Sequence, residues 1–139
     1  MSAANYLTHS RKKWRAAGYY VEGTESIIRL PGGMTRRSDL FGFADLVALP
    51  AEPDSHWPWV FLQVTSWGHV PTRLRKIQRE MTGNGQFVIP IRMLAWRVLE
   101  AGHRIVIEGW KQKKAYAPWE YREREVGFAD LEVLNGLED

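Results

Sequence analysis

Residues 36–50 read RRSDLFGFADLVALP, and residues 59–66 read WVFLQVTS. Within the first stretch, residues 41–49 predict a strand that is apolar on both faces except at Asp45. A polar loop with two prolines follows, and residues 59–65 alternate as a second strand, with Gln63 and Thr65 on one face. The two strands and their loop predict a hairpin.

Helices and further strands are expected on both sides of this hairpin. Residues 4–17 favour a helix that stops at Gly18, and helices are also expected over about 72–81 and 90–101. Short strands are expected over residues 19–21, 26–30 and 103–110, and an exposed edge strand over 119–126. The order α-β-β-β-β-α-α-β-β predicts an α/β, sandwich-like domain.

Length and composition suit one globular domain. The chain has 139 residues, of which 45% are hydrophobic and 25% charged, and it contains no cysteine. A disulfide framework and a thiolate zinc site are therefore excluded. No apolar run is long enough to cross a membrane, and the first residues lack the apolar core of a signal peptide. A cytoplasmic protein without membrane contact is the simplest interpretation.

The net charge of +3 hides an asymmetry along the chain. Residues 1–119 carry 17 Lys and Arg against 9 Asp and Glu, whereas residues 120–139 carry 2 against 7. A basic body attracts polyanions such as nucleic acid, and an acidic C-terminal tail over about 120–139 would suit a basic partner. The alternative is a solvated surface without a partner.

Asp45 is the residue of this hairpin that points most clearly to chemistry. A carboxylate in an apolar strand is costly unless a cation or hydrogen bonds compensate it. If the hairpin has ordinary register, Asp45 and Gln63 point to the same end of it, and two oxygen ligands there would suit Mg²⁺. The alternative is an aspartate that hydrogen-bonds a nearby turn and a glutamine that is satisfied locally.

The order of these motifs resembles the PD-(D/E)xK nuclease superfamily, most of all its archaeal Holliday-junction-resolvase-like branch. The matching features are a helix ending in Gly18-Tyr19, the GFADLVA motif of residues 42–48, the strand motif Gln63-Val64-Thr65, and a basic helix over 73–81. The resemblance extends from the first helix to Met81. It implies a restriction-endonuclease-like core, in which helices flank a central mixed β-sheet.

The resemblance also implies an activity: metal-dependent hydrolysis of phosphodiesters in DNA, with branched DNA such as Holliday junctions as one substrate. Mg²⁺ or Mn²⁺ would be the cofactor, with Asp45 and Gln63 as ligands. Relatives of this size often act as homodimers, because one small domain covers half of a symmetric junction.

The chain departs from the family pattern at three places. Gln63 replaces the second acid, Thr65 replaces the lysine, and the first helix has no glutamate between residues 6 and 17. Some members keep Gln at the acid position, and others carry the cation on the next helix. The resemblance then assigns the cation to Lys76 or Arg73. The acids that could fill the missing place are Glu22, Glu25 and Asp39.

Nucleic-acid contacts are expected at basic and aromatic residues that flank the hairpin, namely Arg36, Arg37, Trp67, Arg75 and Arg79. The alternative for Trp67 is a loop anchor, and for the arginines a solvated face. Ser66 has no evident histidine and acid partners, which argues against a serine hydrolase. Two other functions stay open: a nuclease fold that only binds nucleic acid, and an interaction subunit that uses the acidic tail.

Overall fold

The centre of the molecule is a mixed five-stranded sheet. The structure is a computed structural model that describes residues 3–24, 26–29, 32, 35–38, 40–78 and 90–132. The strands of the sheet follow the order β1-β4-β5-β6-β7. Their bounds are Tyr19–Gly23 (β1), Leu46–Pro50 (β4), Val60–Ser66 (β5), Arg104–Gln112 (β6) and Trp119–Val126 (β7). The β5–β6 pair is parallel, and the other pairs are antiparallel.

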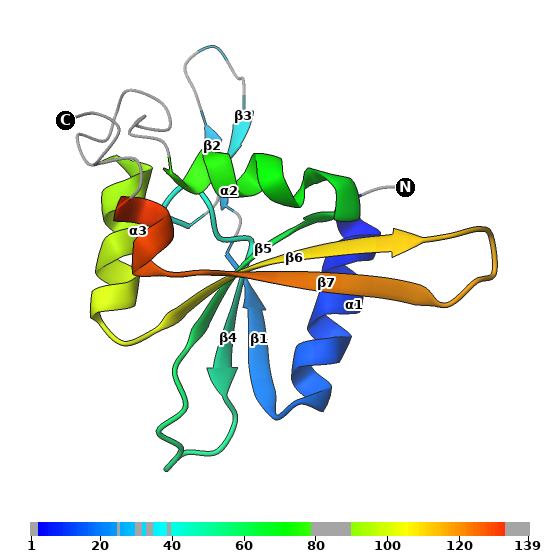
Figure 1. Cartoon of the computed structure of the whole chain (residues 1–139), viewed down its shortest axis with the longest axis horizontal. Helices are drawn as coiled ribbons and strands as arrows, with labels where there is room; N and C mark the ends of the chain where they lie inside the picture. Colours follow the sequence, from blue (N-terminus) through cyan, green and yellow to red (C-terminus); the bar gives the residue numbers. More distant parts are fainter. Residues whose placement is uncertain are drawn as a thin grey trace.

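Helices cover both faces of this sheet, which gives three layers (Figure 1). Their bounds are Ala3–Ala16 (α1), Val70–Gln78 (α2) and Ile91–Glu100 (α3), with a short 3-10 turn, Trp67–His69 (η2), before α2. A separate antiparallel pair is formed by β2, Ser26–Arg29, and β3, Thr35–Ser38. The coarse expectation of an α/β fold with a mixed sheet between helices is confirmed.

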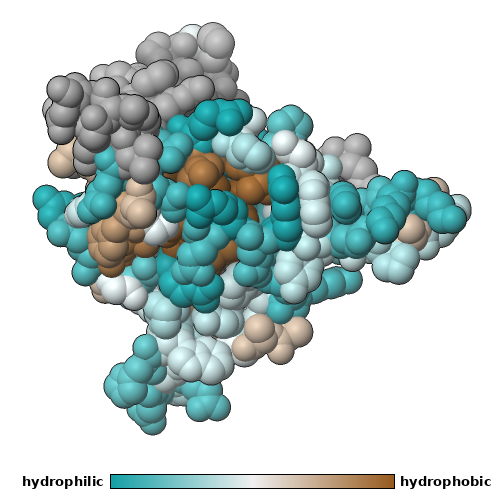
Figure 2. All heavy atoms as spheres, viewed as in Figure 1, coloured by the Kyte–Doolittle hydropathy of each residue, from teal (hydrophilic) through white to brown (hydrophobic). Residues whose placement is uncertain are grey.

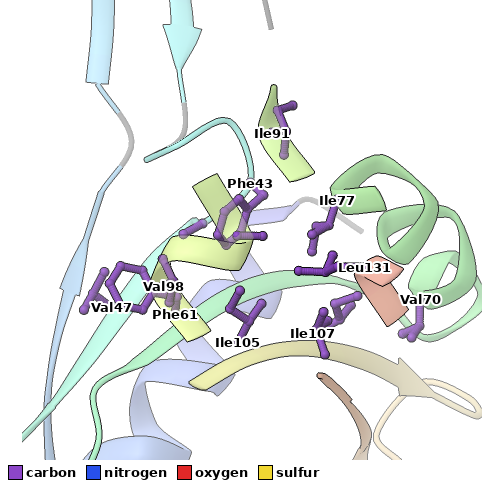
Figure 3. Close-up of a cluster of buried hydrophobic side chains, with 13 residues drawn as sticks. Phe43, Val47, Phe61, Val70, Ile77, Ile91, Val98, Ile105, Ile107 and Leu131 are labelled. Atoms are coloured by element: carbon purple, nitrogen blue, oxygen red, sulfur yellow. The ribbon is translucent and has the colours of Figure 1, made fainter. Parts of the chain in front are cut away.

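Each face of the sheet has its own apolar core. On the face covered by α2 and α3, called the α2 face below, buried side chains from β4, β5, β6 and both helices pack together (Figure 3). On the opposite face, called the α1 face, Trp14 of α1 packs with side chains such as Leu62, Val106 and Trp110. The face to which a strand residue points is therefore known from its partner on the neighbouring strand, because residues paired across two strands point to the same face of the sheet.

The surface away from the two cores is largely polar. Figure 2 shows an apolar area beside α2, while the projecting β6–β7 hairpin and the β4–β5 loop are mostly hydrophilic. Among the residues placed by the structure, no helix has the length and apolar character to span a membrane.

The predicted start of the first hairpin strand is wrong. Residues 41–43 form a turn, closed by a bridge between Leu40 and Ala44, and β4 begins only at Leu46. The backbone φ is +57° at Phe41 and +83° at Gly42, in the left-handed region that strands do not use. An apolar sequence cannot report this local strain, so the periodicity predicted a longer strand.

Other boundaries also differ from the sequence expectation. Strand β3 was not predicted, α2 begins at Val70 instead of Thr72, and β6 extends to Gln112. The predicted end of helix two, residues 79–81, lies outside the described residues. Within the acidic stretch, residues 120–126 belong to β7, so this part is an edge strand of the sheet.

Gly109 explains how the chain passes from β5 to α2. A Cβ atom at Gly109 would lie 2.5 Å from Val70 Cγ2 and 3.0 Å from Trp67 Cα. The glycine thus allows η2 and the start of α2 to lie directly on β6. Gly109 is also paired with Thr65 in the parallel register, which puts this close contact beside the end of the predicted site.

Candidate active site

Asp45 lies immediately before β4 and is held by its main chain. Its N–H donates to the carbonyl of Leu62 at 2.7 Å, and its own carbonyl accepts from the Thr24 N–H at 3.0 Å. The main chain of Asp45 is therefore fixed between β1 and β5, and the turn at residues 41–43 places it in this position. The side chain is half-buried.

The structure brings Asp45 and Gln63 together. Asp45 Oδ2 accepts a hydrogen bond from Gln63 Nε2 at 2.7 Å and another from the Val64 N–H at 2.8 Å. Gln63 is 2% exposed, and its Oε1 atom is buried without a hydrogen-bond partner. An unsatisfied buried amide oxygen costs about 1–3 kcal/mol. The pair thus contains an orphaned oxygen beside a carboxylate.

Gln63 and Thr65 point to the α2 face. In the parallel register Gln63 lies beside Ile107, whose side chain belongs to the core of that face. Thr65 lies two residues further along β5 and is also buried. A threonine hydroxyl carries no charge, so Thr65 cannot balance negative charge as the family's lysine would.

The helix that covers this face is basic. Helix α2 contains Arg73, Arg75 and Lys76 and no acidic residue. Arg73 and Lys76 are half-buried, while Arg75 is exposed and donates from Nη2 to Thr72 Oγ1 at 3.3 Å. The cations that the resemblance assigns to the site therefore lie on the helix over the same face as Asp45 and Gln63.

The other predicted acids do not complete a cluster within the described residues. Glu25, Asp39 and Arg79 lie outside them, and Arg36 and Arg37 lie in β3, where the structure describes the backbone. Glu22 is exposed on β1 and accepts a hydrogen bond from the Tyr20 hydroxyl at 2.6 Å, which raises the pKa of that tyrosine.

In the part of the chain that the structure covers, no three His, Asp or Glu side chains gather as a metal site. The described donors fit Mg²⁺ in kind, because Asp45 and Gln63 both carry oxygen ligands and Mg²⁺ keeps several waters. Gln63 fits in a further respect. The oxygen and nitrogen of its amide can exchange positions by a rotation of the group, and the hydrogen-bonding partners decide which atom takes which position. A half-turn of the amide would direct Oε1 toward the carboxylate, an arrangement that a bound cation would favour.

Two cationic side chains, Lys111 and Arg122, lie over the ring of Trp67. Lys111 Nζ lies 4.0 Å and Arg122 Cζ 5.1 Å from the ring centroid, and Arg122 also donates to the Trp67 carbonyl at 2.6 Å. These contacts match the alternative of a loop anchor. Base stacking on Trp67 stays a prediction.

Ser66 has a histidine neighbour that the sequence did not reveal. Ser66 Oγ and His69 Nδ1 lie within hydrogen-bonding distance, 2.5 Å apart. Ser66 is the N-cap of η2, so the pair is a local contact across one turn. Within the structurally described ranges no carboxylate is hydrogen-bonded to His69, and a catalytic triad is not formed.

A buried carboxylate, Glu108, was missed in the sequence. It interrupts the apolar strand β6 just as Asp45 precedes β4, and this interruption was the available signal. Glu108 is fully buried on the α1 face. Its oxygens accept from Ser10 Oγ at 2.6 Å, Lys13 Nζ at 2.8 Å and Trp14 Nε1 at 3.0 Å.

This network ties α1 to the sheet. Burial alone would lower the pKa of Lys13, but hydrogen bonds to Glu108 and Glu123 outweigh burial and raise it above its ordinary value. Ser10 Oγ also accepts from Trp110 Nε1 at 2.8 Å, so the network continues along β6. Since every donor has its acceptor, we assign Glu108 to the architecture and not to catalysis.

The chain matches no protein family model, no curated protein and no solved structure.

Proposed function

We propose that this protein is a metal-dependent DNA endonuclease of the PD-(D/E)xK type, with Asp45 at the centre of its site. The observation that carries the proposal is the pairing of Asp45 with Gln63 across neighbouring strands, with 2.7 Å between Oδ2 and Nε2. The order of helix, hairpin and basic helix, which is the order of the resemblance, supports it.

The roles follow from the chemistry of the side chains. Asp45 and Gln63 would hold Mg²⁺ or Mn²⁺, and the orphaned Oε1 of Gln63 supports this assignment. The metal, when bound, would polarise the scissile phosphate and lower the pKa of an attacking water. Lys76 or Arg73 would approach the phosphate from α2 and offset its developing charge. One carboxylate brings less charge than two, so we expect weak metal binding.

The substrate and assembly belong to the same proposal. Branched DNA such as a Holliday junction is the substrate class, and a homodimer would place one site at each of two symmetric strands. A cytoplasmic location suits this role.

Substituting Asp45 tests the activity. With Mn²⁺ present, Asp45→Asn should lower cleavage of a four-way DNA junction at least about 10- to 100-fold, the loss typical even for an outer-shell partner of a metal ligand. Asparagine keeps an oxygen for the Val64 N–H and for Gln63, so the fold is retained. Asp54→Asn is the charge-matched control, because Asp54 is exposed in the β4–β5 loop. Equal cleavage by both variants would remove Asp45 from the site.

A second substitution should increase the affinity for the metal. Gln63→Glu restores the family's acid beside Asp45 and should tighten Mn²⁺ binding, measured by electron paramagnetic resonance of free Mn²⁺. The gain arises because a second carboxylate adds charge to the ligand set. Binding that is unchanged by Gln63→Glu and by Asp45→Asn would place the metal elsewhere.

One observation favours a second function, nucleic-acid binding without cleavage. Asp45 Oδ2 already accepts two hydrogen bonds, and Thr65 brings no cation. This alternative predicts salt-dependent DNA binding that survives Asp45→Asn, together with no Asp45-dependent cleavage in any metal. The same two variants, assayed for binding and for cleavage, therefore separate the two functions.

A further inference from the structure

A cavity of about 360 Å³, widely open to solvent, lies at the carboxyl ends of the parallel strands β5 and β6. Its walls come from the amino-terminal half of α1, the η2 turn, β6 and β7, which meet on the same side of the molecule (Figure 1). The lining residues include Tyr6, Ser66, Trp67, Trp110, Lys111 and Trp119. This volume is at the small end of ligand sites and suits one small molecule or one monomer unit.

The aromatic walls are held in place from behind. The His9 ring packs against Trp110 and Trp119, with centroids 5.3 Å and 4.6 Å apart, and Tyr6 meets Trp119 edge-on at 6.1 Å. The Trp110 indole is further fixed by its hydrogen bond to Ser10, which donates to buried Glu108. The buried network of the α1 face thus orients one wall of the cavity before any ligand arrives.

The charge of the lining indicates the class of ligand. Lys111 holds its ammonium 4.0 Å from the centroid of the Trp67 ring, and the residues that line the cavity include no acid. An aromatic cage for a quaternary ammonium would be opposed by this lysine. A planar ring that carries an anion fits both features, because the ring stacks on indole or phenol and the anion pairs with the ammonium.

We propose that this cavity binds a single nucleobase together with its phosphate. The base would stack on Trp119 and Tyr6, and the phosphate would meet Lys111. The choice of a nucleic-acid residue as ligand rests on the proposed function, although the cavity is separate from the Asp45 site. Trp110 belongs to the α1 face and Gln63 to the α2 face, and Ser66 is three residues, about 10 Å, beyond Gln63 on β5. The cavity would hold an unpaired nucleotide, free or at the end of a strand.

Quenching of tryptophan fluorescence by four probes tests the ligand. The probes are dAMP, deoxyadenosine, single-stranded oligo-dA and a blunt duplex. Binding of dAMP and of the single strand, with no competition by the duplex, is expected, because paired bases cannot enter the cavity. Binding of dAMP alone would identify a free mononucleotide as the source, and much tighter binding of oligo-dA would identify a DNA strand. Failure of both to bind, or displacement by choline instead, would overturn the proposal.

Variants on separate elements test the walls. Trp119→Leu and Tyr6→Leu should each weaken dAMP binding at least about fivefold, the smallest loss typical of a removed stacking partner. The control is Trp57→Leu, because Trp57 is 54% exposed in the distant β4–β5 loop. If one wall variant fails to fold by circular dichroism, the other still decides. Unchanged binding in a folded wall variant overturns the proposal.

Lys111→Gln separates the phosphate from the base. It should weaken binding of dAMP several-fold and leave deoxyadenosine unchanged, since deoxyadenosine lacks the phosphate. Lys114→Gln, an equal change of charge at an exposed position of the β6–β7 turn, should alter neither. Equal effects of the two variants would attribute binding to general charge and contradict the site.

The two proposals fail separately. Asp45→Asn should leave dAMP binding intact, because the aspartate lies on the other face. Nucleotide binding without Asp45-dependent cleavage would refute the endonuclease and keep the cavity. Asp45-dependent cleavage, together with nucleotide binding that is unchanged by substitution of Trp119, Tyr6 and Lys111, would support the endonuclease and refute the nucleotide site in the cavity.

Discussion

Asp45 and Glu108 lie on opposite faces of the sheet, each interrupting an apolar stretch of sequence, and the contrast between them separates architecture from candidate chemistry. On the α1 face, Glu108 is fully buried and meets an ammonium, a hydroxyl and an indole N–H. On the α2 face, Asp45 is half-buried, and two neutral donors hold its Oδ2 beside the unsatisfied oxygen of Gln63. A carboxylate that binds its own lysine stabilises the fold, whereas a carboxylate beside an amide whose oxygen is unsatisfied fits the proposed binding of an external cation.

Removing Glu108 should have the largest effect on stability. Glu108→Ala leaves the Lys13 ammonium and the Ser10 hydroxyl without their buried acceptor, and we expect a loss of about 3–5 kcal/mol in the free energy of unfolding. Urea denaturation followed by circular dichroism measures it. The control is Glu123→Ala, the more exposed partner of the same lysine, which should cost less than about 1 kcal/mol. A loss below that of the control would show that Glu108 does not anchor α1.

Lys13 should show the pH dependence of the same network. Its folded pKa is raised above 10.5, so its contribution to stability is complete below the unfolded pKa and disappears as the pH rises through the folded value. We expect wild type to exceed Lys13→Met in stability at pH 7 and to lose that advantage in strongly alkaline solution. Paired urea curves at both pH values measure the difference. A constant difference would contradict the ion pair.

Asp45→Asn should lower the free energy of unfolding less than Glu108→Ala or Lys13→Met does. The asparagine oxygen can still accept from the Val64 N–H, so the loss should be about 1 kcal/mol or less, the worth of a weakened hydrogen bond. The same denaturation series measures it beside the cleavage assay. A loss as large as that of Glu108→Ala would make Asp45 a second structural anchor and weaken the distinction between the faces.

The smallest effect is expected at the edge of the sheet, where Arg104 donates to Glu125 at 2.7 and 2.9 Å. These hydrogen bonds lower the pKa of Glu125 below 4.5, against the opposing effect of burial. The pair is therefore present at neutral pH and lost as the pH falls through the lowered value. Glu125→Gln should cost at most about 1 kcal/mol at pH 7, because the pair is exposed, and nothing well below that pKa. A difference that persists in acid would exclude the ion pair as its cause.

Local patterns in the sequence predicted much of the fold. Alternation identified β5, and Gly18 and Pro90 marked the end of α1 and the start of α3. Glycine readily adopts the positive φ that ends a helix, +98° at Gly18, and proline fixes φ at a value that suits the first turn. The turn at Phe41 was missed, since its positive φ depends on the bridge between Leu40 and Ala44 and not on hydropathy.

The sequence by itself determined that an aspartate interrupts an apolar stretch, that Gln63 and Thr65 share a face, and that a basic helix follows. Only the tertiary structure decided which partners each carboxylate has. Glu108 carries the same sequence signal as Asp45, yet its partners Ser10 and Lys13 lie 98 and 95 residues away. Periodicity reports which way a side chain points within its own strand or helix. The strand order and the packing of α1 decide what it meets there, and this separates the closed network of Glu108 from the candidate site at Asp45.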